Sequence, residues 1–173
     1  CANGPRSASF SASTTPEGMK CHRWITAIRR PATSSTRALA RQDVGDIQGA
    51  MRDLERAGEL EPRDPRPLVE HARLRCNQGD PRGAVAGLDS ALAIDPRLGA
   101  AWVNRSAAQG ELGDYEAAIA DSLRALELDP ETERPARINL TIAYEVLGQP
   151  ERSLQELERV FALAPPDDAL VAA

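Results

Sequence analysis

Residues 112–130 read LGDYEAAIADSLRALELDP, and this stretch decides the fold because its pattern recurs along the chain. The other copies are VGDIQGAMRDLERAGELEP at 44–62, QGDPRGAVAGLDSALAIDP at 78–96 and LGQPERSLQELERVFALAP at 147–165. Each copy has glycine in second place and ends in proline, so successive copies lie 34, 34 and 35 residues apart. A fixed period of this length is typical of arrays in which identical structural units stack on one another.

Each unit is predicted to contain two helices. Within 115–128 the apolar residues recur at helical spacing: Ala118, Ile119, Leu123, Leu126 and Leu128. Asp114 precedes this helix and can accept a hydrogen bond from its first turn, while Pro130 lacks the N–H needed to continue it. Upstream, GAAWVNRSAAQGELG at 99–113 predicts a second helix that stops at Gly113, where a left-handed conformation is tolerated. The unit is therefore helix, tight turn, helix.

These units resemble tetratricopeptide repeats. In the clearest unit the resemblance rests on Trp102, Gly113, Asp114, Tyr115, Ala118, Ala125 and Pro130. The preceding unit carries Gly79, Asp80, Ala84, Ala91 and Pro96, and the first carries Gly45, Asp46, Ala50, Ala57 and Pro62. The fourth keeps Leu140, Tyr144, Gly148 and Pro165 but has Ser153 and Val160 where the family usually has alanine. The resemblance implies an all-α solenoid of about four helix-turn-helix repeats, wound as a right-handed superhelix with a concave face.

This interpretation divides the chain into three parts. We expect a disordered or weakly ordered basic segment at 1–30, a repeat domain at 31–167 and a short tail at 168–173. The repeats would span 31–64, 65–98, 99–132 and 134–167, and the fourth has one extra residue before its first helix. The leading helix of the first repeat, within PATSSTRALARQD, lacks the usual large aromatic residue and leucine.

The small residues of the repeats have a predicted packing role. Ala84, Ala91, Ala118 and Ala125 fall where the resemblance brings two helices close together. A larger side chain there would push the helices apart. Trp102 lies where the family buries a large aromatic side chain, so we expect it to pack between helices rather than to stack on a ligand.

Composition and charge restrict the class of partner. The 173 residues are 42% hydrophobic, 27% charged and only 3% aromatic, which suits closely packed helices. Up to Gln42 there are seven basic residues and one acidic residue, a formal charge of +6, and the remaining 14 basic and 25 acidic residues give −11. The acidic repeat body should repel nucleic acid, so we expect no nucleic-acid partner. No apolar run is long enough to cross a membrane.

The N-terminal segment allows several interpretations. Cys1 followed by small residues resembles the mature end of a bacterial lipoprotein, in which this cysteine carries lipid. The alternatives are a fragment boundary, a true start at Met19 and an organelle transit segment, whose Arg-rich, Ser-rich composition is similar. A membrane partner is expected only if Cys1 is lipidated. We favour a cytoplasmic location, with the bacterial periplasm or outer membrane as the alternative.

The sequence offers no set of residues suited to catalysis or metal binding. Cys1, Cys21 and Cys76 lack the close spacing of a zinc site, and a Cys21–Cys76 disulfide would need an oxidising compartment. The only histidines are His22 and His71, and there is no phosphate-binding glycine loop or dinucleotide motif. We therefore expect no metal, no cofactor and no enzymatic activity.

The resemblance implies that the first helix of each hairpin lines a concave groove that binds an extended peptide or a partner's helix. In the second repeat the groove residues would be Arg66, Val69, Glu70, Arg73 and Asn77. In the third they would be Ala100, Val103, Asn104, Ala107 and Glu111, and in the fourth Ile138, Asn139, Ile142 and Glu145. Asn104 and Asn139 are equally suited to bond a peptide backbone or the backbone of the neighbouring repeat.

We therefore expect a non-enzymatic scaffold or adaptor that binds a peptide or partner protein. The residue types favour a ligand with apolar anchors and an acidic group, since guanidinium groups hold carboxylates bidentately. The only lysine is Lys20, so the lysine-rich clamp with which some family members grip a terminal carboxylate is absent. The alternatives are a lipid-anchored assembly protein of a bacterial envelope and a regulatory module of a larger enzyme. No covering element is evident for Leu154, Leu157, Phe161 and Leu163 of the last helix. Self-association, docking to another protein or truncation of the sequence would each explain this.

Overall fold

The computed structural model describes residues 34–163. The chain divides into the units Cys1–Pro31 and Ala32–Ala173, and the helices described below all belong to the second unit. The predicted disordered segment at 1–30, the interpretations of Cys1 and Cys21, and the tail at 168–173 lie outside the described residues.

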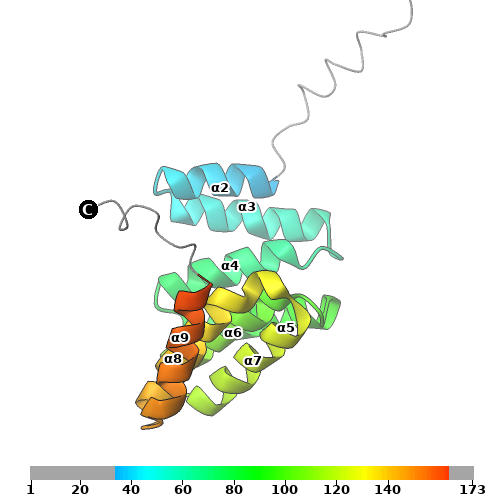
Figure 1. The fold of residues 1–173 in the computed structure, drawn as a ribbon. Helices are drawn as coiled ribbons and strands as arrows, with labels where there is room; N and C mark the ends of the chain where they lie inside the picture. Colours follow the sequence, from blue (N-terminus) through cyan, green and yellow to red (C-terminus); the bar gives the residue numbers. More distant parts are fainter. Residues whose placement is uncertain (1–33, 164–173) are drawn as a thin grey trace, which may run out of the picture. The chain divides into compact units, whose positions relative to one another are not determined.

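Eight α-helices form four hairpins within residues 34–163 (Figure 1). The hairpins are α2 (Ser34–Asp43) with α3 (Ile47–Leu60), α4 (Arg66–Asn77) with α5 (Pro81–Ile94), α6 (Gly99–Leu112) with α7 (Tyr115–Leu128), and α8 (Glu133–Val146) with α9 (Pro150–Ala162). A short 3-10 turn, η1 (Pro130–Thr132), precedes α8 and takes up the extra residue of the fourth unit. The described residues contain no strand, and the all-α repeat fold expected from the sequence is confirmed.

The turn inside each hairpin follows from local chemistry. Gly45, Gly79, Gly113 and Gly148 all have positive φ, between 69° and 83°, a conformation that only glycine adopts without strain. Asp114 then accepts a hydrogen bond from the N–H of Ala117, which satisfies one free donor of the first turn of α7. Aspartates Asp46 and Asp80 cap α3 and α5 in the same way. The predicted helix ends at Gly113 and Asp114 are therefore confirmed.

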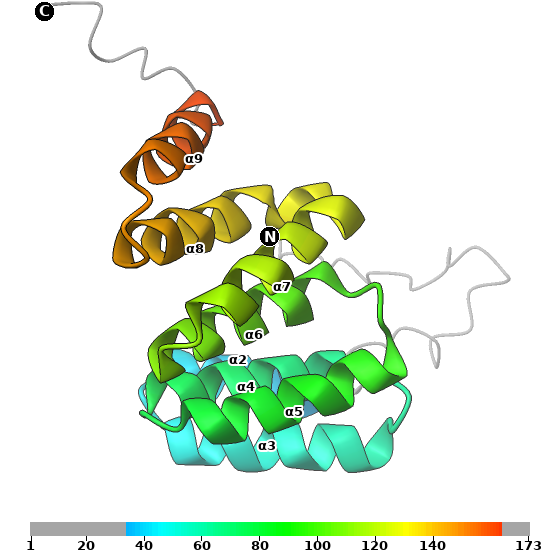
Figure 2. The same ribbon diagram turned by 90° about the horizontal axis from the view of Figure 1, so that it is seen from below.

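The hairpins stack in sequence order (Figures 1 and 2). Each second helix packs against the first helix of the next hairpin: α3 with α4, α5 with α6 and α7 with α8. Contacts also join α4 to α6 and α6 to α8, whereas no comparable contact joins α2 to α4, α3 to α5 or α5 to α7. The first helices of the last three hairpins therefore lie closer together than their second helices. We call the exposed surface of α4, α6 and α8 the inner face.

Alanine and leucine fill the spaces between helices. Ala84, Ala91 and Ala125 are fully buried and Ala118 is 3% exposed, as their predicted packing role requires. The largest fully buried apolar side chains are Leu88 in α5 and Leu140 in α8. Trp102 is half-buried against the same core, and its indole N–H donates to the carbonyl of Pro96 at 2.9 Å. Its packing role is thus combined with a bond to the preceding loop.

Candidate partner-binding surface

The predicted groove residues differ widely in how much surface they present. Exposed residues are Arg66, Asn77, Ala107, Glu111, Ile138, Ile142 and Glu145, and half-buried residues are Glu70, Arg73, Ala100, Asn104 and Asn139. Val69 and Val103 instead lie in the core, with 4% and 9% of their surface exposed. Both point toward neighbouring helices, so they support the inner face but offer a ligand little contact.

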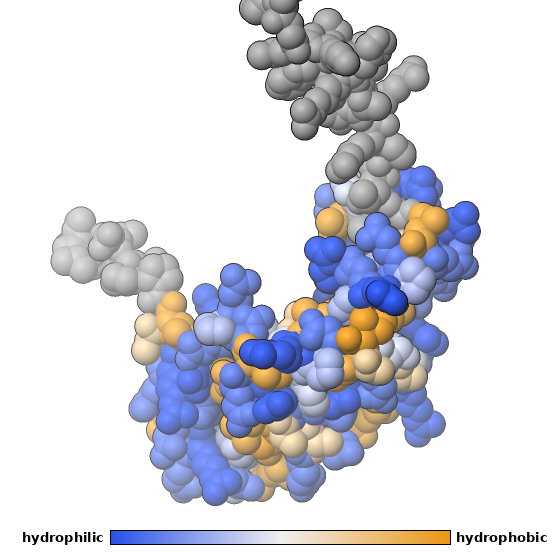
Figure 3. Space-filling model, turned by 90° about the vertical axis from the view of Figure 1, so that its right-hand side faces the viewer, coloured by the Kyte–Doolittle hydropathy of each residue, from blue (hydrophilic) through white to orange (hydrophobic). Residues whose placement is uncertain are grey.

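An apolar stripe runs along α8. Ile138, Ile142 and Val146 are 42%, 53% and 56% exposed, and their spacing of four residues places them on one side of the helix. The sequence prediction included the two isoleucines and missed Val146, although the same spacing would have found it. The small residues Ala107 and Gly110 of α6 leave space on the adjoining part of the inner face. Figure 3 shows hydrophobic residues gathered in patches on an otherwise hydrophilic surface.

The two predicted groove arginines are already paired. Arg73 donates to Glu70 Oε2 at 3.0 and 2.8 Å and to Gln42 Oε1 at 2.7 Å, which ties α4 to α2. Arg66 forms a two-pronged pair with Asp64, with its shortest bond at 2.7 Å. The hydrogen bonds from Arg66 also lower the pKa of the Asp64 carboxyl. A ligand carboxylate would have to compete with Glu70 or Asp64 for these guanidinium groups.

The predicted asparagines make intramolecular bonds. Asn139 Nδ2 donates to the carbonyl of Val103 at 3.1 Å, so it joins α8 to the backbone of the neighbouring hairpin. Asn104 Nδ2 donates to the carbonyl of Ala100, one turn earlier in its own helix, at 2.8 Å. Of the two uses predicted for Asn139, the structure shows the bond to the neighbouring repeat.

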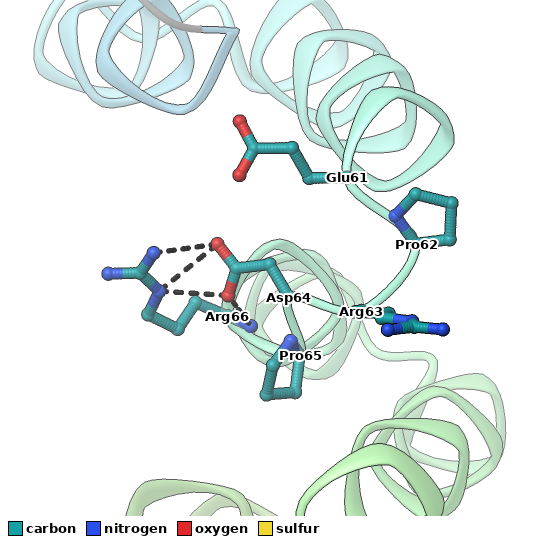
Figure 4. Close-up of a pocket in the computed structure, with 6 residues that line it drawn as sticks. All are labelled: Glu61, Pro62, Arg63, Asp64, Pro65 and Arg66. Atoms are coloured by element: carbon teal, nitrogen blue, oxygen red, sulfur yellow. Dashed lines mark hydrogen bonds and ion pairs between the residues drawn. The ribbon is translucent and has the colours of Figure 1, made fainter.

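A loop depression near this surface contains the Arg66–Asp64 pair (Figure 4). It is lined by the connection from α3 to α4: Glu61, Pro62, Arg63, Asp64, Pro65 and Arg66. Two prolines shape the loop, and the carboxylate of Asp64 accepts from both the backbone N–H and the side chain of Arg66. The depression is therefore explained by a loop structure, and one of its two arginines, Arg66, is already paired with Asp64.

Ion pairs that were not predicted from the sequence recur between the two helices of a hairpin. Arg37 and Asp53 form a bidentate pair at 2.8 and 2.6 Å, and Arg105 and Asp121 form an equivalent pair at 2.7 and 2.8 Å. The hydrogen bond from Arg37 lowers the pKa of Asp53, and the hydrogen bonds of Asp121 and Asp89 raise the pKa of Arg105 despite its burial. In both pairs the arginine precedes the aspartate by 16 residues in the sequence, and this repeated separation could have identified the pairs.

Fully buried polar contacts also cross the third hairpin. Ser106 and Ser122 share a hydrogen bond of 2.7 Å, and the Ser106 hydroxyl lies 2.8 Å from the carbonyl oxygen of Ala118. Both serines are almost completely buried. Their hydroxyls are satisfied within the hairpin, so they contribute to helix packing rather than to a reactive site.

The remaining reactive side chains do not assemble into a catalytic or metal centre. His71 is half-buried, and its Nε2 lies 3.4 Å from Glu55 Oε1. Burial lowers the pKa of His71 and raises the pKa of the Cys76 thiol. Within residues 34–163 no group of histidine, cysteine and carboxylate side chains could hold a metal ion. Among the described helices, none is both long enough and apolar enough to span a membrane.

The arrangement defines a class of protein: an all-helical repeat array with an exposed inner face. Residues 99–132 match the family model described as tetratricopeptide repeat. Residues 99–132 thus match one tetratricopeptide repeat, and the other three hairpins share its helix-turn-helix form. No curated protein sequence matches it.

Several solved structures share the fold. A crystal structure of MamA has a TM-score of 0.65 and 20% identity, and the alignment covers 74% of each chain. The first TPR of Spaghetti (RPAP3), bound to the HSP90 peptide SRMEEVD, has a TM-score of 0.62 and 21% identity over 66% of this chain and 90% of that one. The Arabidopsis OM64 TPR domain has a TM-score of 0.61 and 20% identity over 65% and 92%. Identities this low establish the fold alone.

Proposed function

We propose that this protein is a non-enzymatic interaction scaffold whose inner face binds an extended peptide or a helix of a partner protein. The observation that carries the proposal is the exposed apolar stripe Ile138, Ile142 and Val146 on α8. Large apolar side chains at such exposure, grouped on one side of a helix, are typical of interaction surfaces. The proposal is supported by a structural relative that is bound to a peptide.

The inner face suggests where a ligand would find its contacts. Apolar anchors of the ligand would pack on the α8 stripe, next to the small residues Ala107 and Gly110. Buried apolar surface contributes about 25 cal/mol per Å², so a few anchors supply most of the binding energy. An acidic group on the ligand would lie toward α4, where Arg73 would exchange Glu70 for the ligand carboxylate.

The absence of enzymatic activity is part of this proposal. Its support is that His71, Cys76 and the carboxylates of residues 34–163 form no arrangement with a nucleophile beside a positioned base. The lipid-anchored envelope protein and the enzyme-linked module remain alternatives, and both depend on residues outside the described range.

A matched pair of variants tests the proposal. Ile142→Asp places a charge on the inner face, where the side chain is 53% exposed, and Leu123→Asp places one on α7, where it is 44% exposed. Both full-length variants would be panned against a peptide display library beside the parent protein. We expect peptides selected by the parent to carry spaced apolar residues, to lose binding to Ile142→Asp and to keep binding to Leu123→Asp.

The electrostatic part of the proposal has its own test. Arg73→Glu should weaken the binding of selected acidic peptides while helicity stays unchanged, because the cation facing the ligand is reversed. If acidic peptides bind Arg73→Glu as well as the parent, the acidic-group requirement is wrong. If Ile142→Asp selects the same peptides with the same affinity as the parent, the inner face is not the binding surface.

A further inference from the structure

The two ends of the array expose the two surfaces that every inner junction buries. At an inner junction the second helix of one hairpin packs against the first helix of the next. Within residues 34–163, α9 is the second helix of the last hairpin and α2 is the first helix of the first hairpin. Neither is packed against a further hairpin in this range. Their outward faces can therefore be compared, position by position, with the equivalent faces inside the array.

On α9 the comparison identifies an uncovered apolar stripe. Leu157 is 38% exposed, whereas its equivalents in the three preceding hairpins are 3% exposed or less: Leu54, Leu88 and Ser122. Beside it on the same side of the helix, Leu154 and Phe161 are 56% and 69% exposed. Inside the array these positions are covered by the first helix of the following hairpin. The α9 stripe, Leu154, Leu157 and Phe161, is thus shaped to accept a helix of that type.

On α2 the comparison identifies the matching surface. Ala40 is exposed, whereas its equivalents in the following hairpins are 3% exposed or less: Leu74, Ala108 and Ala143. These equivalents pack against the preceding second helix. Just beyond α2, in the turn that follows Asp43, Val44 is 79% exposed. A small residue at this position allows close approach of two helices, as it does at Ala108 and Ala143.

We propose that copies of this protein associate head to tail, with the α9 stripe of one copy covered by α2 of the next. The contact would repeat the geometry of the inner junctions. Among the described hairpins, only the first, which begins with α2, has no other described hairpin before it. Because the two surfaces differ, the contact is heterologous and each copy keeps one free end, so association continues beyond a dimer. The inner face takes no part, and the inference stands independently of the proposed peptide binding.

Sedimentation velocity of the full chain, from about 1 to about 200 μM, tests the proposal. A helix-to-helix contact is small, and interfaces of this size are weak, which requires the upper end of this concentration range. The expected result is a weight-average sedimentation coefficient that rises continuously without a plateau at the dimer. A coefficient that stays at the monomer value throughout would overturn the proposal.

Two variants block one end each. Phe161→Asp disrupts the α9 stripe and leaves α2 intact, while Ala40→Glu obstructs α2 and leaves α9 intact. Both positions are exposed, so circular dichroism should show unchanged helicity. Each variant alone should be monomeric, and an equimolar mixture should form a 1:1 heterodimer that grows no further. Leu123→Asp, on the outer surface of α7, should associate like the parent.

Other occupants of the α9 stripe give different results. If Ala40→Glu still forms dimers alone and Phe161→Asp does not, two α9 helices pair with each other and the proposal is wrong. If the full chain is monomeric but a variant lacking residues 166–173 associates, the chain's own tail covers α9, which also overturns it. A mixture of the two blocked variants that stays monomeric would contradict the head-to-tail contact directly.

Discussion

Replacing Arg105 with methionine should destabilise the third hairpin strongly. Arg105 holds Asp121 through two hydrogen bonds of 2.7 and 2.8 Å, and their side chains are 18% and 7% exposed. The guanidinium also lies 4.6 Å from the centroid of the Trp102 ring, a contact that methionine can partly replace. The main effect of Arg105→Met is therefore an aspartate left buried without its cation.

The size of the expected loss in unfolding free energy follows from the burial of the Arg105–Asp121 pair. Removing one partner of a buried ion pair costs about 3–5 kcal/mol, because the remaining charge stays desolvated. Arg105 retains some contact with water, so the lower end, about 3 kcal/mol, applies. At about 4 °C per kcal/mol for a chain of this size, Tm should fall by about 12 °C. Urea and thermal unfolding followed by circular dichroism would measure both quantities.

Two controls separate the burial effect from a general loss of charge. Arg124 pairs with Glu127 at 2.7 Å, but both side chains are at least half exposed, so Arg124→Met should cost less than about 1 kcal/mol. The double variant Arg105→Met with Asp121→Leu removes both charges and should regain most of the lost stability. If Arg105→Met is no less stable than Arg124→Met, the reasoning about buried pairs is refuted.

Three further predictions concern local conformation, packing and pH. Gly113→Ala should lower the free energy of unfolding by about 1–2 kcal/mol, because the φ of 83° at this position strains any side chain. Gly110→Ala, inside α6, should leave the free energy of unfolding unchanged or raise it. Equal effects of the two variants in urea unfolding would contradict this prediction. Ala118→Trp should lower the free energy of unfolding by about 1–3 kcal/mol through overpacking, and a variant as stable as the parent would mean that the helix register is wrong. Burial lowers the pKa of His71 in the folded protein, so the unfolded chain binds the proton more tightly. The free energy of unfolding should therefore fall as the pH drops below 6.5. In urea titrations between pH 7.5 and 5, His71→Gln should reduce this pH dependence.

Sequence alone predicts the features that depend on local backbone chemistry. The left-handed glycines and the capping bond of Asp114 each involve neighbours only a few residues away. The period of the repeat then places one hairpin beside the next, which is why the buried positions of Ala84 and Ala125 could also be predicted. These features need no knowledge of which side chains meet across helices.

The inner face was harder to predict because it depends on which neighbouring helices cover each position. Val69 and Val103 share the first helices with Arg73 and Ala107, yet they are buried against residues of the next hairpin. The pairing of Arg73 with Glu70 and Gln42 depends on rotamers and on the approach of α2. Arg105 and Asp121 look like ordinary surface charges in the sequence, and only the packed hairpin shows that they are buried together.

Hydrogen exchange of the full chain, with and without a peptide selected from the display library, tests whether the inner face binds ligand. We expect the peptide to slow exchange in Gly99–Leu112 and Glu133–Val146, the helices that carry the apolar part of the inner face. Exchange in the outer helix Pro81–Ile94 should stay unchanged. Protection confined to the outer helices or to Pro150–Ala162 would contradict the proposal that the inner face is the binding surface.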